Sequence, residues 1–183
     1  MGTTIFRNEE KLNNAEVLSR FSKALIETEK YTKSEIEELA DIYSKNIVDK
    51  FIVSDGSLDD TFGRQGDILF WKEGSEMYNQ EFNRVKNLKK TERTVLQKDD
   101  SMTGDHRFIP TPNSNYTLEE GTFIPSFLKG KGRFAPDPHP CVILETDKPF
   151  LVFHREHGNI ALTAGKYMIC PQLDPATLSR MID

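Results

Sequence analysis

Residues 141–170 read CVILETDKPFLVFHREHGNIALTAGKYMIC, and this stretch decides the fold that the sequence predicts. Short apolar runs alternate in it with polar or glycine-containing turns, which is typical of antiparallel strands. The dipeptides Asp147-Lys148 and Ala164-Gly165 have the length of hairpin turns. We therefore expect two hairpins, built from strands at 141–146, 150–154, 159–163 and 166–170.

Further strands are predicted upstream of this stretch, at 67–71, 91–97 and 122–128. With a short closing helix at 175–182, they define a β-domain over residues 66–183. Many short strands separated by turns favour an antiparallel β-sandwich or a barrel-like domain. The preceding residues 54–65, SDGSLDDTFGRQ, are rich in Gly, Asp and Ser and are predicted to be a linker.

The first part of the chain, residues 1–53, has a helical pattern instead, with apolar side chains three and four positions apart. One helix is predicted to begin at Asn13-Asn14. A second is predicted to begin at Ser34, where Glu37 completes a capping box. The short link between them folds the helices back as an antiparallel hairpin. The predicted fold class is therefore α+β, with an N-terminal helical hairpin followed by an antiparallel β-domain.

Each predicted helix has one apolar stripe, and an isolated pair of helices cannot bury both stripes well. We expect the β-domain or another chain to cover them, so that Phe21, Leu25, Leu39 and Tyr43 are buried. A protein partner, or a second copy of this chain, is predicted to bind through these helices.

Charge and hydropathy argue against two classes of partner. The net charge is −5, and residues 1–60, with 8 basic and 13 acidic side chains, carry all of it. Binding of nucleic acid requires a basic surface, so we expect none. The longest apolar runs, 141–144 and 150–153, are too short to cross a bilayer, and the N-terminus has no secretory pattern. We expect a cytoplasmic protein, in a cell or an infected host cell.

The first candidate for chemistry is a set of two cysteines and two histidines with the spacing C-x12-H-x2-H-x12-C. In the predicted hairpins, Cys141 lies opposite His154, and Cys170 lies opposite Asn159, close to His157. Thiolate and imidazole are the ligands of structural zinc sites, so the set predicts zinc or another divalent metal. The alternative is that both cysteines are small buried hydrophobic residues and the histidines cap a solvated turn.

The second candidate combines His106 with His154, Glu156 and His157. Three histidines, or two histidines and a carboxylate, that leave a coordination position open can hold iron or activate a water molecule. The sequence has no G-x-S-x-G motif, no Walker A loop and no G-x-G-x-x-G motif after a strand. We therefore predict neither catalytic residues nor an organic cofactor, and lean away from an enzyme.

An ordered set of short motifs runs through the β-domain: Arg64-Gln65-Gly66-Asp67, then Thr103-Gly104-Asp105-His106-Arg107, His154-Arg155-Glu156-His157, Leu162-Thr163-Ala164-Gly165-Lys166-Tyr167 and Gln172. In this order (R-Q-G-D, T-G-x-H, H-x-E-H, L-x-x-G-x-Y, Q), the set resembles a family of small, poorly characterised proteins of bacteria and their phages. The resemblance covers about the last two-thirds of the chain. It implies a phage or prophage setting, and therefore a place in the virion as an alternative to the cytoplasm, and it brings no activity with it.

Two functions follow as expectations. The first is a non-enzymatic structural or interaction protein, such as a phage accessory protein or a virion component, because the acidic helical hairpin needs a partner. The second is a small metal-binding enzyme or sensor that uses the cluster of His106, His154, Glu156 and His157.

Overall fold

The computed structural model describes residues 5–7, 13–46, 52–54, 62–97, 105–126, 137–155 and 157–173. The chain folds into two compact units, each assembled from three segments. Unit 1 comprises Met1–Asp59, Thr94–Asn115 and Thr146–Ala164, and unit 2 comprises Asp60–Arg93, Tyr116–Glu145 and Gly165–Asp183. Two contacting helices are followed by two antiparallel sheets of four and six strands, which confirms the α+β class.

The two helices of unit 1 begin at capping boxes. Helix α1 spans Asn14–Thr28, and its N-cap Asn13 exchanges hydrogen bonds with Glu16. Helix α2 spans Lys33–Ser44, with the same exchange between Thr32 and Glu35. The predicted start of the second helix is therefore corrected by two residues, because the Thr32 hydroxyl and the Glu35 carboxylate satisfy the exposed N–H groups of the first turn.

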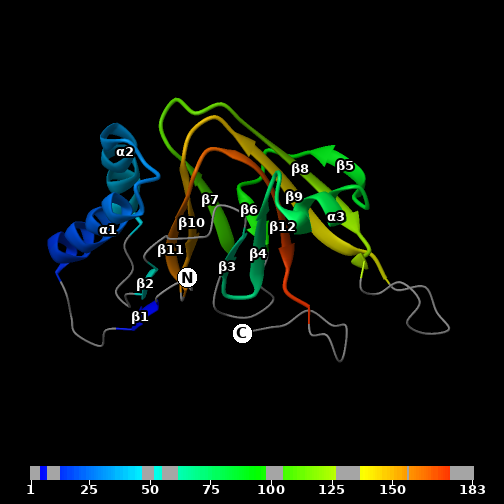
Figure 1. The fold of residues 1–183 in the computed structure, drawn as a ribbon, viewed down its shortest axis with the longest axis horizontal. Helices are drawn as coiled ribbons and strands as arrows, with labels where there is room; N and C mark the ends of the chain where they lie inside the picture. The colour runs from blue at the N-terminus through cyan, green and yellow to red at the C-terminus, as the bar shows by residue number, and fades with distance from the viewer. Residues whose placement is uncertain are drawn as a thin grey trace. The chain divides into compact units, whose positions relative to one another are not determined.

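The apolar stripes of both helices meet in one core cluster, as predicted. Phe21 stacks on Tyr43 with ring centroids 4.3 Å apart. Leu151 and Ala161, from neighbouring strands of the four-stranded sheet, belong to the same cluster, and Ile109 packs against it. Figure 1 shows α1 and α2 beside the strands β10 and β11 that carry these residues. The sheet of unit 1 therefore covers the hairpin.

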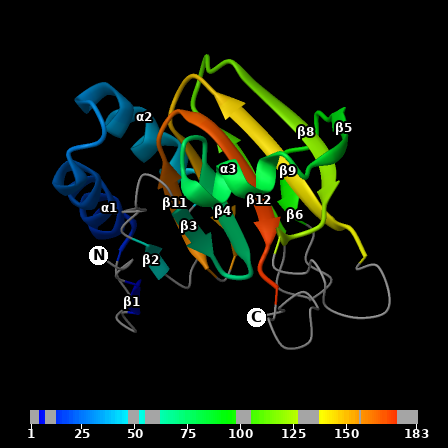
Figure 2. The ribbon, with the colours of Figure 1, turned by 45° about the vertical axis from the view of Figure 1, so that its right-hand side comes forward.

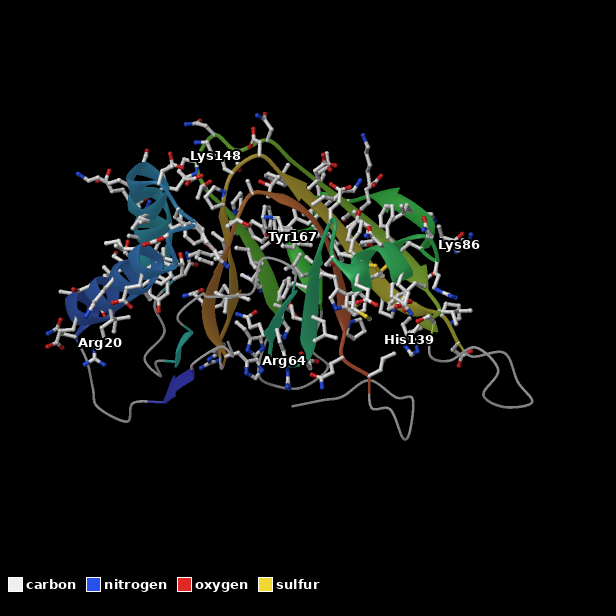
Figure 3. All side chains as sticks on the ribbon, viewed as in Figure 1. Arg20, Arg64, Lys86, His139, Lys148 and Tyr167 are labelled. Atoms are coloured by element: carbon white, nitrogen blue, oxygen red, sulfur yellow. The ribbon has the colours of Figure 1, made fainter. Side chains whose placement is uncertain are left out.

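Polar contacts also join the hairpin to this sheet. The ammonium group of Lys148, labelled in Figure 3, lies 3.3 Å from the carboxylate of Glu38 on α2. The side-chain amide of Asn159 donates a hydrogen bond of 3.1 Å to the carbonyl oxygen of Asn46, just beyond the end of α2. Because a backbone carbonyl withdrawn from water needs a hydrogen-bond partner, Asn159 satisfies the Asn46 oxygen where the chain leaves α2.

The four-stranded sheet of unit 1 has the order β11-β10-β7-β6. Its strands span Val95–Gln97 (β6), His106–Pro110 (β7), Phe150–His154 (β10) and Gly158–Leu162 (β11). Leu151 pairs with both Ala161 and Ile109, so these three side chains share the face that packs on the helices. Val152 and His154 therefore point to the opposite face. A separate pair of strands, β1 (Ile5–Arg7) and β2 (Ile52–Ser54), also belongs to unit 1.

The six-stranded sheet of unit 2 has the order β3-β4-β12-β9-β8-β5. Its strands span Phe62–Gln65 (β3), Ile68–Lys72 (β4), Lys86–Lys90 (β5), Tyr116–Phe123 (β8), His139–Thr146 (β9) and Gly165–Pro171 (β12). Helix α3 (Glu76–Phe82) packs on β4 and β12, as Figure 2 shows. Strand β3 falls within the residues that the sequence predicts as a linker.

Both predicted C-terminal hairpins are wrong, although their strands are present. Strands β9 and β12 belong to the six-stranded sheet, whereas β10 and β11 belong to the four-stranded sheet. Cys141 therefore does not pair with His154, and Cys170 pairs with Leu69 on β4 instead of Asn159. Asp147 lies where the chain passes from β9 to β10, and both of its carboxylate oxygens accept hydrogen bonds from Asn115, at 2.7 and 2.6 Å. Asp147 thus stabilises a connection to a distant segment and not a tight turn.

Two predicted features lie outside the described residues, namely the closing helix at 175–182 and Glu156. None of the described helices is long and apolar enough to span a membrane.

Candidate metal centre

Three histidines gather at one end of the four-stranded sheet of unit 1. His106 is the first residue of β7, and His154 is the last residue of β10. Phe153 pairs with Arg107, so the next step of this antiparallel register places His154 opposite His106. His157 lies in the connection to β11, and Gly158, which begins that strand, pairs with His154. The antiparallel pairing therefore brings together residues that lie about fifty positions apart.

The three side chains are close enough to share one ion. One nitrogen from each ring lies within 4.8 Å of the corresponding nitrogen of the other two. The ring centroids are 4.2 Å apart for His106 and His154, 4.3 Å for His154 and His157, and 5.8 Å for His106 and His157. His106 and His154 are buried, at 1% and 0% exposure, and His157 is half-buried. Among the residues that the structure describes, this is the group that can hold a metal ion.

A backbone hydrogen bond defines the state of one of these rings. The backbone N–H of His157 donates to Nδ1 of His154 at 3.2 Å. In a neutral imidazole one nitrogen carries the proton and the other accepts, so this bond assigns the proton of His154 to Nε2. Gly158 follows with φ of 72°, a left-handed conformation that glycine adopts without strain. It lets the chain turn tightly back into β11 while the His157 N–H points at the ring.

Neutral imidazole is a ligand for zinc, copper, iron and nickel, and the choice among them depends on geometry and availability. Three protein ligands leave at least one coordination position for water or a substrate, as in catalytic zinc sites. Two nitrogens on a tetrahedral zinc ion are about 3.4 Å apart, because each Zn–N bond is about 2.1 Å long. The observed spacing of up to 4.8 Å is therefore within reach of ring rotations.

The two cysteines of the first candidate set belong to unit 2. Cys141 and Cys170 lie in a core cluster with Trp71, Phe123 and Met168, and both are free thiols. Burial raises the pKa of Cys141 to about 12, and burial is also the main reason that the pKa of Cys170 lies well above its ordinary value. Both groups are therefore thiols in the folded protein, as the interpretation of small buried hydrophobic residues expects.

The fourth histidine, His139, also belongs to unit 2 and lies on β9 (Figure 3). Its ring contacts the ring of Phe123 with centroids 6.5 Å apart. Burial lowers the pKa of His139, and the nearby Asp137 partly opposes this effect. Since His139 stands outside the three-histidine group, it provides a natural control for experiments on that group.

A second buried polar cluster in unit 2 has a structural explanation. The carboxylate of Glu81 on α3 is 1% exposed and accepts hydrogen bonds from the backbone N–H and the hydroxyl of Ser126. The guanidinium Nε of Arg84 lies 3.8 Å from the same carboxylate. Because a buried carboxylate must be paired, this contact anchors the end of α3 to the segment that follows β8.

All three histidines are among the metal ligands predicted from the sequence, but the strand that begins at His106 was not predicted. The sequence carries only a short signal for it, the charged Arg107 between His106 and the apolar Phe108, and the structure buries His106 and Phe108 while it exposes Arg107. The hydrogen bond from the His157 backbone was not predicted either, since no side-chain pattern marks a backbone donor.

Comparisons with known proteins add no relative: no family model, no curated protein and no solved structure matches this chain. The geometry of the three histidines is therefore the basis for proposing a function.

Proposed function

We propose that the protein binds one divalent transition-metal ion, with zinc as the first candidate, through His106, His154 and His157. The observation that carries this proposal is the spacing of the three rings, which places one nitrogen of each within 4.8 Å of the others. Two of the three ligands lie on adjacent strands of a sheet that a helical hairpin covers on its other face. Such rigid elements hold ligands in place more precisely than loops do.

The burial of the cluster supports the same conclusion. His106 and His154 are almost completely withdrawn from water. Imidazole binds a metal in its neutral form, so burial does not penalise the ligand state as it penalises a thiolate or a carboxylate. The ion would supply a positive charge and a Lewis acid at the half-buried His157, where a water molecule or a small substrate can complete the coordination. Both a sensor and a small metalloenzyme use such a site.

The structural or interaction role in a phage remains a prediction from the sequence. Its motivation was a hairpin with two apolar stripes that need a cover. Leu151 and Ala161 supply a cover within unit 1, so the stripes by themselves no longer require a second chain. The metal site is therefore the function that the described geometry supports best.

Metal analysis of protein purified without chelator, followed by zinc titration against a chromophoric competitor, tests the proposal. We expect about one zinc ion per chain. Loss of a residue that only hydrogen-bonds to a metal ligand lowers metal affinity roughly 10–100-fold. His106→Ala and His154→Ala each remove a ligand itself and should lower the zinc affinity by more than this. The matched control is His139→Ala, which removes a histidine of the other unit and should leave the affinity unchanged.

Two results would contradict the proposal. One is a wild-type protein that binds no stoichiometric metal, and the other is an equal loss of affinity in the His139→Ala control. The double variant Cys141→Ala/Cys170→Ala separates the two candidate ligand sets. It should retain zinc if the histidines alone bind the ion, and lose it if the cysteines are ligands.

A further inference from the structure

The ring of His154 stacks on the rings of His106 and His157, and rings stacked in this way cannot bind one ion until at least one of them turns. The angles between ring planes are 24° for His106 and His154, 19° for His154 and His157, and 12° for His106 and His157. The lone pair of an imidazole nitrogen lies in the ring plane, so a bound ion lies close to that plane. Stacked planes are separated by about 3.5 Å, the contact distance of carbon atoms. An ion in one plane would then lie farther from the next plane than a Zn–N bond of about 2.1 Å allows.

The hydrogen bond at His154 leads to the same conclusion independently. While Nδ1 accepts the N–H of His157, the ring proton sits on Nε2, and neither nitrogen has a lone pair to give to an ion. Coordination through Nδ1 replaces this hydrogen bond directly. Coordination through Nε2 moves the proton to Nδ1, which then faces another donor. Either way, the neutral ring cannot bind the ion and keep its hydrogen bond to His157.

We infer that metal binding switches the contact between the ring of His154 and the backbone N–H of His157 between two states. In the metal-free state the rings are stacked and the N–H of His157 is bonded to His154. In the metal-bound state the ring of His154 turns, the stack opens and the N–H of His157 is released. The inference rests on the proposed function and adds a conformational response to it.

The response is local, and the surrounding structure explains why. Leu151 and Val152, earlier on the same strand, are buried and paired with both neighbouring strands. His154 is the last residue of β10, and its pairing with Gly158 is the final step of the ladder to β11. Because the two events are linked, the hydrogen bond lowers the affinity for the metal by the same factor by which the bound metal weakens the hydrogen bond. A protein with this arrangement reports metal through one hydrogen bond between His157 and His154, as a sensor does.

Nuclear magnetic resonance on the full chain, with ¹⁵N-labelled histidine and zinc as the probe, tests the inference. In the metal-free protein we expect the proton of His154 on Nε2. At saturating zinc, hydrogen exchange at the His157 amide should become about five- to tenfold faster, which corresponds to the loss of one neutral hydrogen bond. The amides of Val152 and Ile160, paired within the sheet, provide the internal control and should not exchange faster.

Two variants at one position separate the roles of the His154 ring. His154→Asn keeps an acceptor, Oδ1, near the place of Nδ1, and should retain slow exchange at the His157 amide without zinc. His154→Leu removes the acceptor and should show fast exchange. Equal exchange in both variants would overturn the assigned hydrogen bond.

The outcomes also distinguish this inference from the proposed function. Zinc that binds while exchange at His157 stays unchanged overturns the inference and leaves the proposed function in place. A proton on Nδ1 of His154 in the metal-free protein likewise overturns the inference alone. Failure of zinc to bind the wild-type chain overturns the proposed function and this inference with it.

Discussion

Unit 1 contains three histidines and unit 2 contains two buried cysteines, and both residue types are able to bind metals. The surroundings of the two groups differ. In unit 1, His106, His154 and His157 stack on one another, and a backbone N–H bonds to one of the rings. In unit 2, Cys141 and Cys170 lie among Trp71, Phe123 and other apolar side chains. Both groups are candidates in the sequence, and burial alone does not separate them.

The difference is that burial acts on the two ligand types in different ways. A cysteine binds metal as a thiolate, and an apolar environment disfavours that charge, as the raised pKa of Cys141 shows. A histidine binds metal as a neutral ring, so the same burial leaves its ligand form intact. The comparison teaches that a buried histidine cluster is a better candidate for a metal site than a buried cysteine pair among aromatic rings.

The largest expected effect concerns the two thiols. Burial raises the pKa of Cys141 from 9.0 to about 12, so at pH 8 its thiolate fraction is about 1000-fold lower than in the unfolded chain. A thiol reagent that reports by absorbance should therefore modify the folded protein at least about 1000-fold more slowly than the denatured protein. Thiols that react equally fast in both states would break the comparison, because unit 2 would then hold reactive cysteines.

The next effect concerns helices α1 and α2, which pack on the four-stranded sheet of unit 1. Leu25 is 0% exposed in the core cluster, and its neighbour Ile26 is 61% exposed on the same helix. We expect Leu25→Ala to lower the free energy of unfolding by about 2–5 kcal/mol, because it leaves a cavity. Ile26→Ala is the matched control and should change it by no more than about 0.5 kcal/mol. Urea unfolding measures both, and similar values for the two variants would show that the stripe is not buried.

The smallest effect sharpens the comparison by testing a third buried titratable group. Burial raises the pKa of Tyr43 from 10.0 to about 12, although a hydrogen bond from Asn159 partly opposes this. Only the unfolded chain then ionises between these values, so stability is complete below pH 10 and is lost as the pH rises toward 12. At pH 11 the loss due to Tyr43 is about 1.4 kcal/mol.

The variant Tyr43→Phe isolates this contribution. Its free energy of unfolding should fall less steeply between pH 9 and pH 11 than that of the wild-type protein, by about 1.4 kcal/mol. Other alkaline groups are common to both proteins and cancel in the difference. Parallel curves for the two proteins would mean that the Tyr43 hydroxyl ionises as readily in the folded state as in the unfolded state.

Local patterns in the sequence determined much of the fold. The spacing of apolar residues and the capping residues predicted both helices, because helix formation depends on contacts three and four residues apart. The start of α2 shifted by two residues, since Thr32 with Glu35 and Ser34 with Glu37 have the same spacing. Strands such as β10, predicted and observed at 150–154, follow from the same kind of local pattern.

Tertiary structure decided which strands pair, and with that the composition of the candidate site. The dipeptide Asp147-Lys148 has the composition of a tight turn, but Asp147 bonds to Asn115, 32 residues away, and the chain crosses to another sheet. A turn pattern specifies a change of direction and not the strand that receives the chain. The sequence by itself therefore determined that histidines end one strand and follow it, whereas only the pairing of β7 with β10 decided that His106 joins them.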